Sequence, residues 1–143
     1  MARSAGNSFT INYVLFGFIA GFLAVPLFHQ LASYGLFLAV PGRNFPWSMR
    51  PNAYGVPGLL NLAFWGGVWG ILFAFVQTRF PRGVTYFILA FLFGAILPTA
   101  FSWYVLQPMR GRGIGAFSIY GPLLNGAWGL GTGIIYMLLN RRR

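Results

Sequence analysis

The polar residues that could bind a ligand are few, and they lie within long apolar stretches of the sequence. They are one imidazole and two carboxamides, from His29, Asn61 and Asn125. Polar groups are costly inside a membrane segment, so they often mark a functional site there. One interpretation is that they form a small pocket, beside two indole rings on which a flat or lipidic ligand could stack. The candidate ligand-binding residues are therefore His29, Asn61, Asn125, Trp65 and Trp128.

Each of these residues also has a purely structural interpretation. Asn61 and Asn125 can hydrogen-bond across helices and lock a bundle, which is worth roughly 0.5–2 kcal/mol per contact in a membrane. Trp65 and Trp128 lie beside glycines, and a large ring can fill the groove that a missing side chain leaves. Binding and packing are therefore both open for these positions at the level of sequence.

The charge composition excludes most catalytic chemistry. The chain has ten Arg and neither Asp nor Glu, so it has no carboxyl pair for acid–base catalysis and no carboxylate ligands for calcium or magnesium. It also has no Cys, and a single His cannot form a zinc site without other strong ligands. We therefore expect a protein that is not an enzyme and that uses no metal and no cofactor.

The elements that position the candidate residues are predicted to be membrane helices. Hydrophobic residues make up 57% of the 143 residues and charged residues only 7%, far below the roughly 25% of soluble domains. Four apolar runs are long enough to cross a hydrocarbon layer about 30 Å thick. We predict a single all-α integral membrane domain over residues 1–143, folded as a four-transmembrane-helix bundle. Its spans are about 11–28, 58–76, 84–106 and 122–139.

The predicted spans place their polar side chains at one depth. His29 ends the first span, and Asn61 and Asn125 lie about one turn inside the second and fourth spans. Thr99 and Ser102 occupy the matching half of the third span. All four helices therefore contribute to one polar layer, on the side opposite the termini.

The arginines predict the orientation of the chain. Six of them lie on the side that carries both termini and four on the other side, and Arg-rich loops tend to stay in the cytoplasm. We therefore predict that both termini are cytoplasmic, with Arg141, Arg142 and Arg143 binding anionic lipid headgroups. Because the arginines are dispersed between apolar runs, they do not indicate nucleic acid. Residues 31–40 either extend the first span or lie at the interface, and their length does not decide between the two.

Small residues recur four positions apart in each span. Pairs of this kind let two helix backbones approach closely, and close packing is what holds helices together in lipid. We therefore predict a tightly packed bundle. The pairs are Gly17 with Gly21, Gly66 with Gly70, Ala90 with Gly94, and Gly129 with Gly133.

An internal repeat is also indicated. At an offset of 64 positions, residues 59–71 align with 123–135, and both segments begin with Leu-Leu-Asn. At an offset of 73, Gly21 aligns with Gly94 and Phe18 with Phe91. Such a duplication predicts two tandem helical hairpins with the same orientation in the membrane. Chance similarity between helices rich in Leu and Gly is the alternative.

Four motifs together resemble a known family. They are "PLFHQ" (26–30), "YGVPGLLNLAFWGGVWG" (54–70), "FGAILPT" (93–99) and "LLNGAWGLGTG" (123–133). The chain resembles, over nearly its whole length, a family of small uncharacterised bacterial inner-membrane proteins with four transmembrane helices. The resemblance implies a four-span protein of the bacterial inner membrane, and it implies no activity, substrate or cofactor.

The sequence favours a non-enzymatic integral membrane protein that acts as an accessory or structural subunit, or assembly partner, of a membrane complex or homo-oligomer. The alternative is a small transporter or channel, or a lipid- or quinone-binding membrane protein, that uses the polar layer. The two hypotheses differ in one structural requirement. The alternative requires that the polar layer converge on a cavity, whereas an accessory subunit needs only packing contacts.

Overall fold

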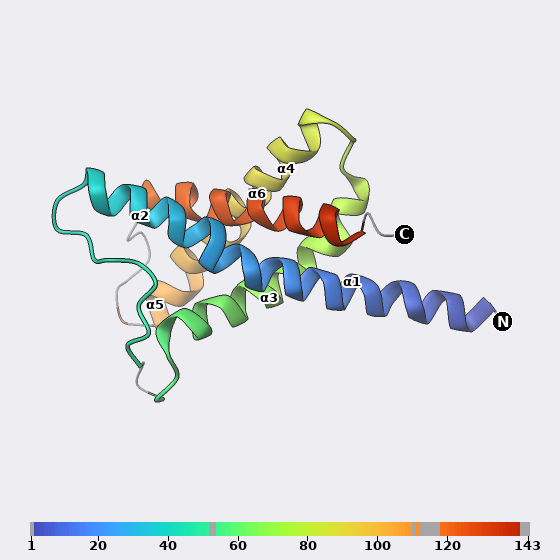
Figure 1. Cartoon of the computed structure of the whole chain (residues 1–143), viewed down its shortest axis with the longest axis horizontal. Coiled ribbons are helices and arrows are strands. Elements are labelled where there is room, and N and C mark those ends of the chain that lie inside the picture. The colour runs from blue at the N-terminus through green and yellow to red at the C-terminus, as the bar shows by residue number, and fades with distance from the viewer. Residues whose placement is uncertain (1, 52–53, 110, 112–117, 141–143) are drawn as a thin grey trace.

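The structure is a computed structural model that describes residues 2–51, 54–109, 111 and 118–140. Within these residues the chain is helical apart from its connections (Figure 1). Two helices continue through a π-helical turn into a further helix, so each forms one long rod. The elements are α1 (Ala2–Ala24), η1 (Val25–His29), α2 (Gln30–Ala39), α3 (Gly58–Val76), η2 (Gln77–Arg79), α4 (Val84–Phe101), η3 (Ser102–Leu106), α5 (Gln107–Met109) and α6 (Tyr120–Asn140).

The described residues contain four helical rods that are long and apolar enough to cross a membrane. This confirms the predicted all-α four-helix fold. The first rod runs without a break from Thr10 to Ala39, so residues 31–39 extend the first helix. At 1.5 Å per residue it is about 45 Å long, which exceeds the roughly 30 Å hydrocarbon layer and requires tilt or projection beyond it. The other candidate spans are Gly58–Arg79, Val84–Met109 and Tyr120–Asn140.

The two ends of the bundle differ in what they carry. Both termini and the short connection between α3 and α4 lie at one end, which we call the terminal end (Figure 1). The connections from α2 to α3 and from α5 to α6 lie at the opposite end, which we call the loop end. This arrangement is the one expected for two hairpins with the same orientation.

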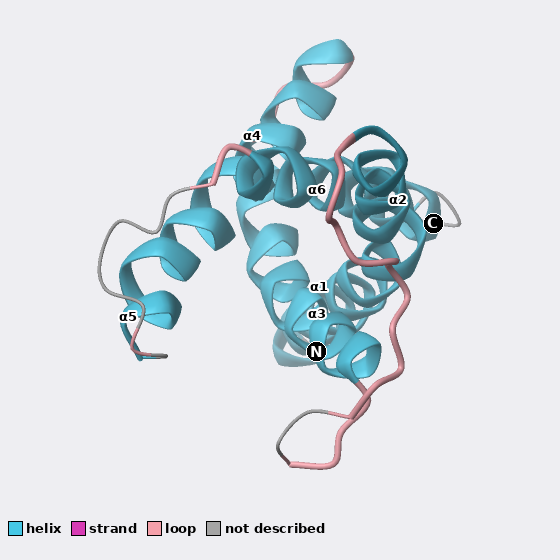
Figure 2. Ribbon diagram, turned by 90° about the vertical axis from the view of Figure 1, so that its left-hand side faces the viewer, coloured by secondary structure: helices cyan, strands magenta, loops and turns pink. Residues whose placement is uncertain are grey.

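The helices pack in the order α3, α1, α6 and α4. The closest pairs are α1 with α3 and α4 with α6, and α1 packs against α6 in the middle. Seen from the loop end, α6 lies between α4 and α2 (Figure 2). The backbones of α3 and α4 hardly approach each other, and side chains fill the space between them.

The two hairpins share one mode of packing. A Cβ atom added to Gly21 would meet the carbonyl oxygen of Gly66 and lie 2.9 Å from the Cα atom of Gly70. A Cβ atom added to Gly94 would likewise meet the carbonyl oxygen of Asn125 and lie 2.9 Å from Cα of Gly129. Both interfaces are thus backbone-to-backbone contacts that leave no room for a side chain, as the glycine pairs predict.

The register of this repeat differs from the predicted one. Gly67 faces the ring of Phe18, and Gly126 faces the ring of Phe91 in the same way. The second helices of the hairpins therefore correspond at an offset of 59 positions, not 64, while the first helices keep the predicted offset of 73. The corrected register pairs Trp69 with Trp128, and the two Leu-Leu-Asn segments are not equivalent.

The long connection between α2 and α3 is held against the first rod. The indole nitrogen of Trp47 donates a hydrogen bond to the carbonyl oxygen of Pro26, over 2.8 Å. The Trp47 ring also packs with Tyr34 and Phe45. In addition, the guanidinium of Arg43 lies 4.9 Å from the centre of the Tyr120 ring, at the start of α6. The connection therefore covers the loop end and touches both hairpins.

Candidate functional site

A cavity of about 240 Å³ lies in the loop-end half of the bundle, between α3 and the α4–η3 rod. Each of the four rods contributes to its lining. Leu62, Trp65, Gly66 and Trp69 come from α3, and Pro98, Phe101, Ser102 and Leu106 come from α4 and η3. Val25 and His29 come from η1, and Asn125 and Trp128 come from α6. We call this space the lateral cavity.

The lateral cavity brings together four of the five candidate ligand-binding residues: His29, Trp65, Asn125 and Trp128. Asn61 does not line it. The residues of α3 that do so, from Leu62 to Trp69, recur at helical spacing on one face, and Asn61 lies off that face. Asn61 and Asn125 therefore do not share the one polar layer that the sequence predicts. The two residues are not equivalent, because the second helices of the hairpins correspond at an offset of 59 positions and not 64.

His29 is oriented by its neighbour in the chain. Its Nδ1 atom lies 2.9 Å from Oε1 of Gln30, and this oxygen can only accept. Nδ1 therefore donates, and a neutral ring keeps Nε2 as an acceptor. Gln30 is buried, so the pair is held within the protein.

The His29–Gln30 pair also separates two cavities. Gln30 lines a second cavity of about 480 Å³ near the loop end, together with Arg43 and several polar residues of the long connection. Leu62 lines both cavities. The pair and Leu62 thus lie between the cavity at the loop end and the lateral cavity.

Asn125 makes a contact between helices and also lines the cavity. Its Nδ2 atom donates a hydrogen bond of 2.8 Å to Oγ1 of Thr99, which links α6 to α4. The bond uses the amide nitrogen and leaves the side-chain oxygen as an acceptor. Asn125 therefore helps to lock the second hairpin and also contributes a polar group to the cavity lining.

The two candidate tryptophans differ in environment. Trp128 is only 3% exposed, and its indole nitrogen donates a hydrogen bond of 3.0 Å to the carbonyl oxygen of Gly21. This bond joins α6 of the second hairpin to α1 of the first. Trp65, in contrast, is 54% exposed, and its ring packs edge-on against Phe64. The packing interpretation therefore holds for Trp128, whereas Trp65 lies at the mouth of the cavity.

Replacing Trp128 by Phe is expected to lower the free energy of unfolding by about 1–3 kcal/mol, because it removes the hydrogen bond between the hairpins and part of a buried ring. The measurement is the loss of helical circular dichroism during titration with sodium dodecyl sulphate. Replacing the exposed Trp65 by Phe is the matched control and should change stability by less than about 0.5 kcal/mol. Equal stability of both variants would show that the Trp128–Gly21 bond contributes nothing.

A layer of aromatic rings closes the lateral cavity toward the terminal end. Phe73 packs edge-on against Phe93, with ring centres 5.3 Å apart, and Phe93 lies 6.3 Å from Trp128. Phe73 also contacts Tyr136 at 6.5 Å, and both of these residues are almost fully buried. Because Trp128 lines the lateral cavity and Tyr136 lines a cavity at the terminal end, this layer separates the two spaces.

The fold and the four apolar rods define a multi-pass α-helical membrane protein. Comparisons with protein-family models, curated proteins and solved structures returned no match for this chain. The resemblance to small bacterial inner-membrane proteins therefore stays a prediction, and the function has to be inferred from the cavities themselves.

Proposed function

We propose that this chain is a non-enzymatic membrane protein that binds a lipidic ligand in the lateral cavity. The observation that supports this proposal is the convergence of His29 and Asn125 on a cavity whose other walls are largely aromatic. Of the two hypotheses from the sequence, this convergence favours lipid or quinone binding. The role of accessory subunit in a complex or homo-oligomer stays a prediction, which pull-downs in mild detergent would test.

The position of the cavity supports entry from the bilayer. Trp65 and Phe101 line the cavity and are 54% and 40% exposed on the surface that four membrane-spanning rods present to lipid. The adjoining helices α3 and α4 are bridged mainly by ring pairs such as Trp69 with Phe101, whose centres are 5.7 Å apart. Ring rotation can widen such a gap more easily than separation of two packed backbones. A ligand can therefore enter sideways, between α3 and α4.

The polar atoms of the cavity indicate which ligands fit. Nε2 of His29 and the side-chain oxygen of Asn125 are both hydrogen-bond acceptors. They suit an uncharged amphiphile whose polar end carries a hydroxyl group, such as a quinol or a lipid alcohol. Because drug-sized ligands occupy about 300–1,000 Å³, a cavity of about 240 Å³ would hold the polar end or ring of the ligand, while its chain stays in the membrane.

The aromatic layer favours binding over conduction. Phe73 and Tyr136 are 0% and 2% exposed, and they close the path from the lateral cavity to the terminal end. An open pore would need a hydrated path through this layer. We therefore propose a ligand-binding protein and not a channel.

For the cellular location we propose the bacterial inner membrane, with both termini in the cytoplasm. The support is the excess of arginines on the terminal side and the placement of both termini at one end of the bundle. Arg141, Arg142 and Arg143, which are predicted to bind anionic headgroups, lie outside the described residues. Reporter fusions at both termini and in the 40–57 connection would test the orientation, and an extracytoplasmic signal from either terminus would contradict it.

The binding proposal can be tested by photo-crosslinking in lipid nanodiscs. The probes are an azido-quinol and a diacylglycerol with a diazirine in one acyl chain, and crosslinked peptides are identified by mass spectrometry. We expect crosslinks to concentrate on residues 62–69 and 98–106 and to be competed by an unlabelled quinol or lipid alcohol. Uniform labelling of all lipid-exposed helices, without competition, would contradict the proposal.

A further inference from the structure

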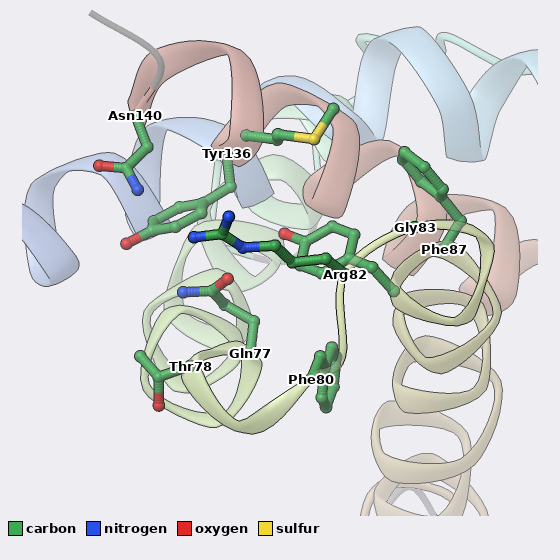
Figure 3. Close-up of a pocket in the computed structure, with 10 residues that line it drawn as sticks. Gln77, Thr78, Phe80, Arg82, Gly83, Phe87, Tyr136 and Asn140 are labelled. Carbon is green, nitrogen blue, oxygen red and sulfur yellow. The ribbon is translucent and has the colours of Figure 1, made fainter. Parts of the chain in front are cut away.

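A separate cavity of about 560 Å³ lies at the terminal end of the bundle (Figure 3). It is formed where the end of α3, the short connection to α4, the start of α4 and the end of α6 meet. We call it the terminal cavity. Its lining includes Gln77, Phe80, Arg82, Phe87, Met137 and Asn140.

The lining of the terminal cavity is amphipathic. Arg82, Gln77 and Asn140 provide charge and hydrogen-bonding groups, whereas Phe87 and Met137 provide apolar surface. Figure 3 shows the Arg82 side chain extending from the connection into the cavity, toward the side that carries Gln77, Tyr136 and Asn140. A ligand that fills this space needs a polar anionic end and an apolar body.

Arg82 is the group available to bind that anion. Nε2 of Gln77 donates to the carbonyl oxygen of Ala74, and the hydroxyl of Thr78 donates to that of Phe75, so both side chains already cap the end of α3. The sequence contains no Asp and no Glu, so no side-chain carboxylate of this chain can neutralise the guanidinium. The side chains of this chain therefore offer Arg82 no counter-charge, and a guanidinium matches the geometry of a phosphate.

The depth of the cavity indicates the source of the phosphate. Its lining residues lie at the ends of three candidate spans, which finish at Arg79, begin at Val84 and finish at Asn140. The ends of membrane spans lie at the level of the lipid headgroups. The phosphates of membrane phospholipids therefore lie at the same depth as this cavity.

We propose that the terminal cavity is a binding site for the phosphate headgroup of an anionic glycerophospholipid. Arg82 pairs with the phosphate, Asn140 hydrogen-bonds the headgroup, and Phe87 and Met137 contact the upper part of the acyl chains. The site is distinct from the lateral cavity, because the layer of Phe73 and Tyr136 lies between them. It does not depend on the function proposed above.

The test is native mass spectrometry of the full chain, released from nanodiscs of phosphatidylglycerol mixed with phosphatidylcholine. We expect the wild-type protein to retain phosphatidylglycerol selectively, and Arg82→Gln to reduce its retention by about tenfold or more, because the phosphate loses its charge-assisted contact inside the cavity. Arg79→Gln is the matched control, because Arg79 is exposed on η2 and does not line the cavity. It should reduce retention by less than about twofold.

Two further arms keep the test decisive. Arg82→Lys keeps the charge but loses the planar fork, so retention should fall between those of the wild type and Arg82→Gln. Inorganic phosphate in excess distinguishes a lipid site from a site for soluble phosphate. Equal losses in Arg82→Gln and Arg79→Gln would overturn the proposal, and so would full displacement of the lipid by inorganic phosphate.

Discussion

Replacing Gly21 by Val is expected to disrupt the bundle, with a loss of about 3 kcal/mol or more in the free energy of unfolding. An added Cβ atom would meet the carbonyl group of Gly66 and lie 2.9 Å from the Cα atom of Gly70. These atoms belong to the backbone, so no side-chain rotation can relieve the clash. The α1 and α3 helices would have to separate, which would also disturb the bond from Trp128 to the Gly21 carbonyl.

Gly35 provides the matched control. Like Gly21 it lies in a helix, but it is exposed, and an added Cβ atom there would meet nothing within 4 Å. Gly35→Val should therefore unfold at the same concentration of sodium dodecyl sulphate as the wild type, as followed by circular dichroism. Gly94→Val should behave like Gly21→Val, since Gly94 holds the equivalent position between α4 and α6. Wild-type stability of Gly21→Val would refute the proposed backbone contact.

Combined replacement of His29 and Asn125 by Ala is expected to weaken ligand binding by about tenfold or more. Each side chain contributes one acceptor to the lateral cavity, and a hydrogen bond is worth roughly 0.5–1.5 kcal/mol. Two lost bonds then correspond to about 1–3 kcal/mol, where each 1.4 kcal/mol is a factor of ten in affinity. The measurement is the concentration of unlabelled quinol that halves azido-quinol crosslinking.

Two control variants separate binding from folding. Asn61→Ala removes a carboxamide that does not line the cavity, so the affinity should be unchanged. Thr99→Val breaks the Asn125–Thr99 bond but keeps the amide, so stability should fall while binding is largely retained. If Asn61→Ala weakened binding as much as the double variant, the ligand would not occupy the lateral cavity.

Much of the fold could be predicted from sequence because it depends on local properties. The length of the apolar runs predicts the spans, and the small residues four positions apart predict the close contacts. The register of the repeat could not be predicted in this way. Leu-Leu-Asn is a strong identity in sequence, but the hairpins correspond through the residues that face the neighbouring backbone, such as Gly70 and Gly129. This steric equivalence becomes visible only when the helices are packed.

Part of the candidate site could also be predicted, because it too depends on local properties of the sequence. A polar residue in an apolar helix is conspicuous, so His29 and Asn125 could be found from sequence. Phe101 also lines the cavity, but a Phe in an apolar run carries no signal of its own. Whether Asn61 and Trp65 face the cavity or the surface depends on how α3 is rotated about its own axis. The hydrophobic pattern of α3 does not determine this rotation, because the helix is apolar on all sides.

The most direct test is an experimental density map of the wild-type protein in lipid nanodiscs, at a resolution that shows side chains. We predict elongated non-protein density between α3 and α4, with one end within about 3 Å of Nε2 of His29 or the side-chain oxygen of Asn125. Closure of the Trp65 and Phe101 rings over the space, with no density other than protein within it, would contradict the proposed function.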